Sequence, residues 1–269
     1  HRVLELAGVP EAAWGYLLTT LGQEVDLPML VLTPRPEEAR RLYDQLLTYW
    51  GNKPFIHHMP EHEVLPYERL VTDATTMHRR LHILAAMVGF PGAQAPPAVV
   101  SSLAALAQKT VPKERLAAAC HTLRQGQHVG LEALLKHWAY LGYRMEMGVE
   151  VPGTMSRRGG ILDIYPPGSP FPARLELWDD YIESIRLFDP GTQRSLKVVD
   201  SLSIIPAQEH LSHVDEDALS SLTKKLDFSN CTVGVRDRIQ EEISALLAGY
   251  SIEDGSFYGG FFNHGTLLD

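Results

Sequence analysis

The chain has 269 residues, 45% hydrophobic and 21% charged, which is enough for one large folded domain or about two or three small ones. The formal net charge of −9 argues against a general nucleic-acid binder, because neutralising phosphates requires a surplus of Lys and Arg. With only Cys120 and Cys231, a disulfide framework and a structural zinc site are excluded, and we expect two free thiols in a reducing compartment.

The first part of the chain alternates short apolar runs with helical patterns. Residues 29–33 form an apolar run typical of a buried parallel strand, and Pro36 opens a helix that Gly51 ends. The elements predicted next are, in order, a strand at 55–59, a helix at 73–87 and a strand at 98–101. Alternating strands and helices predict a parallel sheet covered on both faces.

The middle of the chain changes to a period of two. A helix is predicted over 131–141 and is closed by Gly142. Over 144–151, apolar residues alternate strictly with polar residues and glycine, which predicts a strand with one buried face. Closely spaced turn signals then separate short strands, among them 173–178 and 181–188, so the sequence predicts an antiparallel meander.

These shifts of pattern divide the chain into three predicted domains. Residues 1–118 form the α/β part, residues 119–206 the mainly antiparallel part, and residues 207–269 a mainly helical remainder with a loop-like aromatic end. The acidity lies in the tail, because residues 208–269 hold 4 Lys/Arg against 11 Asp/Glu.

The expected cellular location of the protein follows from two patterns that the sequence lacks. No apolar run reaches the roughly 18 residues that a membrane helix requires, and the N-terminus shows no signal-peptide pattern. We therefore expect a cytoplasmic protein with no membrane partner. The chain begins at His1 and stops shortly after Leu267 and Leu268, so we expect a monomeric segment of a longer protein.

A phosphate-binding P-loop is not predicted. Its pattern, G-x-x-x-x-G-K-[S/T], needs a Lys to reach the phosphates. The nearest match starts at Gly8, but Ala13 stands at the second glycine and Trp14 at the lysine. An indole does not replace an ammonium group, so we expect no nucleotide hydrolysis and no bound cofactor in this chain.

Other catalytic and metal patterns are also set aside. His57, His58 and His62 cluster, but Pro60 interrupts their spacing, so loop histidines are favoured over a zinc site. The acids 215–217 resemble a Walker-B string but precede a helical pattern, where carboxylates cap a helix N-terminus. No G-x-S-x-G elbow occurs. We therefore expect no catalytic residue and no metal, and binding is the default class of function.

Residues 151–195 are the most specific part of the sequence. They resemble the UvrB-homology module of the bacterial transcription-repair coupling factors (Mfd). The matching positions are Gly153, 158–164 (RGGILDI), Pro166, 174–176 (RLE), Asp180, 183–186 (ESIR), 188–189 (FD) and 193–195 (QRS). Residues 65–68 (LPYE) and 142–144 (GYR) fit the same family, so the resemblance spans nearly the whole chain.

The resemblance implies a fold and a function. Residues 1–118 would be a degenerate P-loop NTPase-like domain 1a, residues 119–206 an inserted UvrA-binding domain 2, and residues 207–269 part of domain 1b. This chain would be a non-catalytic module that recruits UvrA. The full-length family members are ATP-dependent DNA translocases, and their motor, with ATP and Mg, and their contacts to RNA polymerase and double-stranded DNA would lie in other domains.

The related UvrB, the damage-recognition ATPase subunit of the excision nuclease, is the alternative. It would need an intact P-loop, and it would need a long Tyr-rich hairpin to insert into DNA. Here the space between strand 55–59 and the next helix holds only residues 60–73, with Tyr67 as the one aromatic residue. Both absences favour the coupling factors.

The resemblance also implies three UvrA-contacting residues. Arg144 stands at the arginine of the GYR match, Arg158 at the arginine of RGG, and Tyr165 where the family has Phe. Two arginines and an aromatic ring are typical of binding hot spots. Arg157 precedes Arg158, so the sequence leaves open which of the two is the contact, and ordinary solvated strand arginines remain the alternative.

Overall fold

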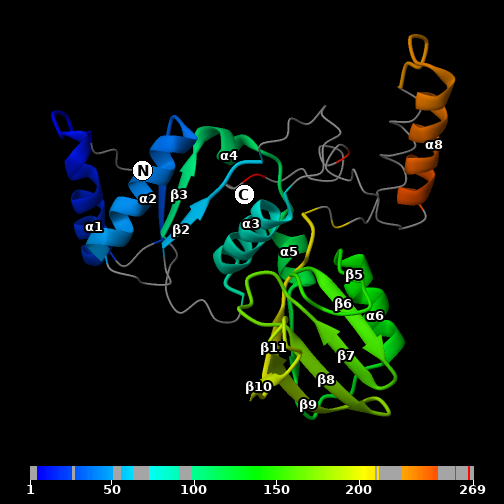
Figure 1. Cartoon of the computed structure of the whole chain (residues 1–269). Helices are drawn as coiled ribbons and strands as arrows, with labels where there is room; N and C mark the ends of the chain where they lie inside the picture. The colour runs from blue at the N-terminus through cyan, green and yellow to red at the C-terminus, as the bar shows by residue number, and fades with distance from the viewer. Residues whose placement is uncertain are drawn as a thin grey trace. The chain divides into compact units, whose positions relative to one another are not determined.

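The computed structural model describes residues 5–25, 28–50, 56–62, 73–90, 98–209, 211, 226–247, 258 and 266. The protein has the mixed α/β class that the sequence predicted, and the described residues form one parallel sheet and two further sheets (Figure 1). Contacts divide the chain into two compact units. The first comprises His1–Glu61 and Gly92–Gln108, and the second comprises His62–Pro91 and Lys109–Asp269.

The first unit is built on a parallel sheet with the strand order β1-β3-β2. The strands are β1 (Met29–Thr33), β2 (Ile56–Met59) and β3 (Ala98–Ser102), and both neighbouring pairs are parallel. The predicted parallel sheet is therefore confirmed. Its helices are η1 (Glu11–Ala13), α1 (Trp14–Glu24), α2 (Pro36–Trp50) and α4 (Leu103–Ala107). The apolar runs of the strands and one stripe of α2 form the core: Val31, Ala39, Leu46, Ile56, Ala98 and Val100.

The second unit begins with helix α3 (Ala74–Met87), which the sequence predicted within a residue. Asp73 caps it: the carboxylate accepts the backbone N–H groups of Thr75 at 3.2 Å and Thr76 at 3.0 Å. These bonds stabilise the charged form and lower the pKa of Asp73. Helices α5 (Lys113–Ala119), α6 (Leu131–Tyr140) and α8 (Val233–Leu247) follow along the chain.

A six-stranded sheet dominates the second unit, with the order β10-β9-β8-β7-β6-β5. Successive strands from β6 to β10 pair antiparallel, so the predicted meander is confirmed, whereas β5 pairs with β6 in parallel. The strands are β5 (Arg144–Met145), β6 (Thr154–Arg158), β7 (Ile161–Ile164), β8 (Ala173–Trp178), β9 (Tyr181–Phe188) and β10 (Ser195–Val198). A separate antiparallel pair joins β4 (His121–Arg124) to β11 (Ser201–Ile204).

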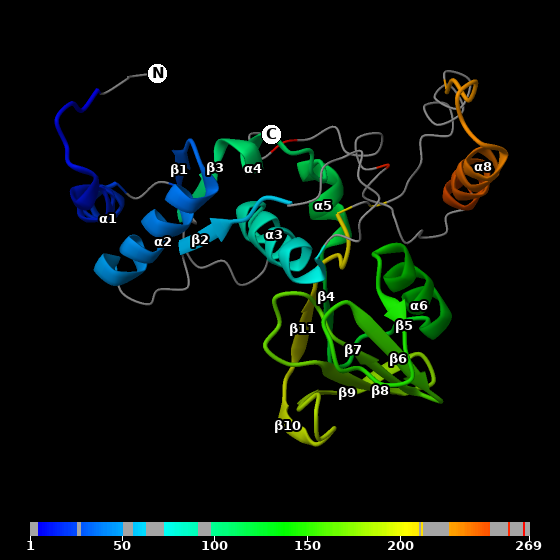
Figure 2. The ribbon, with the colours of Figure 1, turned by 45° about the horizontal axis from the view of Figure 1, so that its top comes forward.

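The strand register gives this sheet two different faces. Leu162, Leu175 and Ile185 occupy one row across β7, β8 and β9, and none of them is exposed. Arg157 shares their parity, since it is the register partner of Leu162, and it forms an ion pair with Glu132 of α6. This inner face is therefore the one that α6 covers (Figures 1 and 2).

One sequence prediction is wrong in this region. The alternating segment 144–151 does not form a strand with a buried face, because β5 covers only Arg144 and Met145 and the chain then leaves the sheet. Met145, Met147 and Val151 are 52%, 94% and 51% exposed, and only Val149 is buried. A period of two shows that apolar and polar residues alternate. It does not show that a neighbouring strand pairs with the segment along its whole length.

The last part of the chain is described in pieces. Helix α8 agrees with the predicted helical tail, and the Tyr258 hydroxyl donates to Glu242 Oε2 at 2.7 Å. The acids 215–217, the LPYE match at 65–68 and the aromatic residues Phe257, Phe261 and Phe262 lie outside the described residues. The domain boundaries expected from the sequence stay a prediction.

Candidate partner-binding surface

The sheet face opposite α6, called here the outer face, carries mostly polar side chains. Successive side chains of a strand point to opposite faces, so the register decides which residues share it. One row holds Ser156, Asp163, Arg174 and Arg186, and the next holds Arg158, Ile161, Glu176 and Ser184. Polar rows on one face and leucines and isoleucines on the other are typical of a sheet with one packed face.

The three predicted UvrA-contacting residues lie on this outer face. Arg144 is the register partner of Thr154 on β6. Tyr165 follows β7, and its backbone N–H donates to the carbonyl of the same Thr154 at 3.0 Å. Arg158 is four residues further along β6, about 13 Å away at a rise of about 3.3 Å per residue. The sheet thus brings together residues that are 21 positions apart in the chain.

The register also separates Arg158 from its neighbour Arg157. Arg157 belongs to the inner face, where its Nη1 donates to Glu132 Oε1 at 2.5 Å. Arg158 belongs to the outer face, and its Nη2 donates to the Met147 carbonyl at 3.1 Å. Of the doubled arginine, only Arg158 shares a face with Arg144 and Tyr165.

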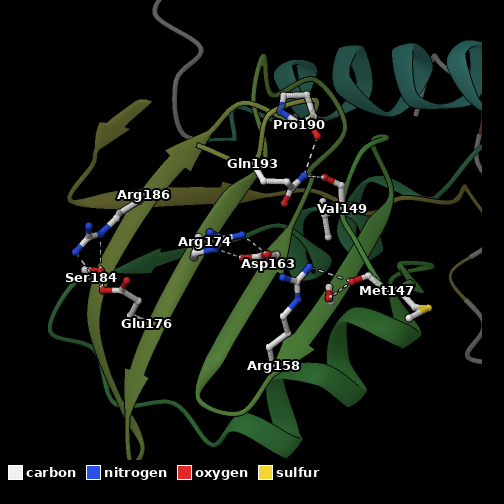
Figure 3. A network of polar contacts seen from close by, with 11 residues as sticks. Met147, Val149, Arg158, Asp163, Arg174, Glu176, Ser184, Arg186, Pro190 and Gln193 are labelled. Carbon is white, nitrogen blue, oxygen red and sulfur yellow. Dashed lines mark hydrogen bonds and ion pairs between the residues drawn. The ribbon is translucent and has the colours of Figure 1, made fainter. Parts of the chain in front are cut away.

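Two other arginines of the outer face are held by carboxylates (Figure 3). Arg174 Nε and Nη2 donate to the two oxygens of the buried Asp163 at 2.7 and 2.8 Å. This bidentate bond raises the pKa of Arg174, and the guanidinium also lies over the Phe188 ring, 4.7 Å from its centroid. Arg186 Nη2 donates to Glu176 Oε2 at 3.2 Å. These two charges are neutralised within the sheet.

Arg144 and Arg158 differ from Arg174 and Arg186 in their surroundings. Both side chains are exposed, and within the described ranges neither forms an ion pair with a carboxylate. Burial lowers the pKa of His78 on α3, and the positive charge of Arg144 also lowers it. The outer face therefore offers two guanidinium groups, each with N–H donors available for an acidic partner.

Tyr165 presents a partly covered ring and is separated from Arg144 by the Thr154 position of β6. Its hydroxyl donates to the Pro170 carbonyl at 3.3 Å, and burial raises the pKa of the phenol. The hydrogen bond fixes the ring without removing it from the surface, where its half-buried state leaves an apolar edge accessible.

Two loops close one end of the outer face. Gln193, which has a positive φ of 59°, donates its amide to the carbonyls of Pro190 at 2.7 Å and Val149 at 3.4 Å. This bridge ties the 146–150 loop to the loop that follows β9, and Figure 3 shows it above the Arg174–Asp163 pair. The same 146–150 loop also reaches Arg158, which donates to the Met147 carbonyl.

The structure also describes the segments that were considered for a P-loop, a metal site, a membrane helix and a reactive cysteine. Gly8 has a φ of +75° and precedes η1, and Glu11 pairs with Arg41 of α2. Among the described residues no three His, Cys, Asp or Glu side chains are grouped as a metal ion would need, and no helix there is long and apolar enough to cross a bilayer. Both cysteines are free, and burial raises the pKa of Cys120 to about 12, so its thiol is a poor nucleophile.

Comparison with known proteins identifies the part of the chain that carries this surface. Residues 122–210 match the UvrB interaction domain. The transcription-repair-coupling factor of Myxococcus xanthus is 29% identical over 97% of this chain and 22% of its own length. That of Escherichia coli is 29% identical over 76% of this chain and 17% of its own length. The UvrABC system protein B of Thermosipho africanus is 24% identical over 84% of this chain and 36% of its own length.

The resemblance to the transcription-repair coupling factors is confirmed. The chain spans about a fifth of the length of the coupling factors it matches. The matched residues 122–210 contain β5 to β11, and therefore all of the outer face.

Two features of this surface were not predicted from the sequence. One is the pair of Asp163 and Arg174, although both lie at polar positions flanked by apolar residues in adjacent short strands, which is the signal that would have found them. The other is Met147, which was expected on a buried face; no feature of the sequence shows that this residue is 94% exposed.

Proposed function

We propose that this chain is the UvrA-recruiting part of a transcription-repair coupling factor and acts in transcription-coupled nucleotide excision repair. The match of residues 122–210 to the UvrB interaction domain and the similarity to named coupling factors support this role. The observation that carries it is the pair of exposed arginines, Arg144 and Arg158, on one sheet face without a carboxylate partner among the described residues.

The proposed contact is a set of charge-assisted hydrogen bonds around one apolar edge. Arg144 and Arg158 would each donate to carboxylates of UvrA, and the ring of Tyr165 would pack against UvrA at the Arg144 end of the surface. Arginine makes bidentate bonds to carboxylates and loses little side-chain hydration when it does so. The neighbouring Arg174 does not serve this purpose, because Asp163 already occupies its donors.

The rest of the chain would serve this recruitment without chemistry of its own. We interpret residues 1–118 as a degenerate NTPase-like domain, residues 119–206 as the UvrA-binding domain and residues 207–269 as part of a further domain. Trp14 in place of the P-loop lysine and the three-stranded parallel sheet support the first assignment. DNA translocation with ATP and Mg, and contacts with RNA polymerase and double-stranded DNA, would belong to other parts of a longer cytoplasmic protein.

Titration calorimetry with purified UvrA tests the proposal. The chain should bind saturably at physiological salt, and Arg144→Ala and Arg158→Ala should each weaken binding by about 1–3 kcal/mol. Arg124→Ala is the matched control, because Arg124 is an exposed arginine on β4, outside the six-stranded sheet. Unchanged binding by a folded Arg144→Ala/Arg158→Ala double variant, or no binding by the unaltered chain, would overturn the proposal.

The alternative, a UvrB-like ATPase that recognises damage, is supported by the similarity to UvrABC system protein B. It predicts ATP turnover by this chain that depends on residues 8–14. An ATPase assay of the unaltered chain beside a Trp14→Ala variant separates the two proposals, since a recruitment module shows no turnover in either.

A further inference from the structure

The 146–150 loop displays an apolar side chain beside the arginine of the outer face. Met147 is 94% exposed, more than any other large apolar side chain among the described residues. Figure 3 shows it pointing away from the sheet next to Arg158. Covering a side chain of this size with an apolar surface of a partner would provide the free energy that its exposure forgoes.

The backbone of this loop is held in place by hydrogen bonds. The Met147 carbonyl accepts from Arg158 Nη2 at 3.1 Å and from Ser156 Oγ at 3.3 Å. One residue earlier, the Glu146 N–H donates to the Met155 carbonyl at 2.8 Å, and two residues later Gln193 holds Val149. The side chain is therefore presented on a fixed loop, which lowers the ordering cost of binding a partner.

We propose that Met147 is the apolar anchor of the UvrA-facing surface and that it enters an apolar pocket of UvrA with carboxylates on the side that meets Arg158. This inference rests on the proposed function and extends it to a residue that family resemblance did not indicate. Carboxylates of UvrA are expected on the Arg158 side of the pocket, because Arg158 bonds to the Met147 backbone, whereas the loop itself carries the exposed acids Glu146 and Glu150.

The side chain and the hydrogen bond suit this task. A thioether with three rotatable bonds fits irregular apolar pockets, and hot spots are apolar anchors surrounded by polar contacts that exclude water. The guanidinium has five N–H donors, so the bond to Met147 leaves others for a carboxylate of the partner. Arg158 thus has two roles, as a contact and as a positioning residue for the loop.

Titration with UvrA tests the anchor through three variants. Met147→Ala should weaken binding at least tenfold, and Met147→Gln, of similar length but polar, should weaken it comparably. Met147→Leu should stay within about threefold of the unaltered chain, because an apolar side chain of similar volume is retained. The control is Leu196→Ala: Leu196 is 52% exposed on β10, at the opposite edge of the same sheet, and its loss should leave affinity unchanged.

The outcomes distinguish this inference from the proposed function. Unchanged affinity of Met147→Ala, while Arg144→Ala and Arg158→Ala lose binding, would overturn the anchor and leave recruitment standing. No binding by the unaltered chain would remove both. Because the Met147 side chain is nearly fully exposed, the Met147 variants should unfold at the temperature of the unaltered chain. A loss of affinity at unchanged Tm then shows that the lost contact is with UvrA.

A double-mutant cycle tests the positioning role of Arg158. If Arg158 holds the loop, the combined Met147→Ala/Arg158→Ala variant should lose less affinity than the product of the two single losses. Losses that multiply independently would restrict Arg158 to a direct contact and contradict the positioning role.

Discussion

Arg80 and Glu209, 129 residues apart, form a buried ion pair in which Arg80 Nε donates to Glu209 Oε1 at 2.8 Å. Only 2% of each side chain is exposed. Thr110 Oγ1 donates to the other carboxylate oxygen at 3.3 Å, and His62 Nε2 lies 3.2 Å from Oε1. The cluster therefore connects α3 to the segment that follows β11, within the second unit.

Removing one member of this pair should destabilise the protein strongly. Arg80→Met leaves the Glu209 carboxylate buried without its counter-charge, which we expect to cost about 3–5 kcal/mol in the free energy of unfolding. The double variant Arg80→Met/Glu209→Leu should lose less than the two single variants together, because neither charge remains. Urea unfolding followed by circular dichroism measures both. A loss below about 1 kcal/mol for Arg80→Met would contradict a buried pair.

The same carboxylate predicts a pH dependence of stability. Burial alone would raise the pKa of Glu209. The charge of Arg80 and the hydrogen bond with His62 have the larger, opposite effect, and the pKa is lowered from an ordinary value of 4.5 to about 2. A depressed acid pKa contributes stability above pH 4.5 that is lost as the pH falls toward 2, about 3 kcal/mol in all. Acid titration of the unfolding free energy should show this loss in the unaltered chain and not in Glu209→Gln.

Buried histidines should cause a loss of stability at a higher pH than Glu209 does. Among the histidines that the structure describes, burial lowers the pKa of four below the ordinary 6.5: His78, His82, His121 and His137. Their neutral forms are favoured by folding, so stability should begin to fall as the pH drops below 6.5, before Glu209 titrates. For His78 the charge of Arg144 adds to burial, so Arg144→Ala should raise the pKa of His78 in an NMR titration. An unchanged pKa would mean that Arg144 points away from α3, and Arg124→Ala is the control.

Much of the secondary structure was predictable because it depends on local signals. The apolar run of β1 and the Asp73 cap of α3 each act within a few residues, and the sequence predicted both elements closely. The meander was predicted from its turn residues, which set hairpins through local backbone conformation.

The surface depends on information that a single sequence does not hold. Choosing Arg158 over Arg157 needs the strand register, because a shift of one residue exchanges the two faces of a sheet. The exposure of Met147 needs the knowledge that β5 ends after two residues. The Arg80–Glu209 pair joins distant segments, and no periodicity predicts it. Family resemblance supplied candidate positions, and the register supplied their common face.

A glycine in the second unit provides a final test of how closely α3 packs against the 166–168 turn. Gly168 has a φ of +77°, and a Cβ there would lie 2.2 Å from Nδ1 of His82 on α3. Gly168→Ala should therefore cost about 2–5 kcal/mol, from a left-handed backbone together with overpacking. Gly159→Ala isolates the backbone part, since Gly159 has a φ of +63° with nothing within 4 Å of a Cβ, and it should cost about 1–2 kcal/mol.

The difference between the two glycine variants measures the contact with His82. Adding His82→Ala to Gly168→Ala removes the atoms that the new methyl group meets, so the double variant should lie closer to Gly159→Ala in its cost. Thermal unfolding of the three variants and of His82→Ala alone gives the coupling free energy between the two sites. Equal costs for Gly168→Ala and Gly159→Ala, with no coupling to His82, would show that α3 does not pack against this turn.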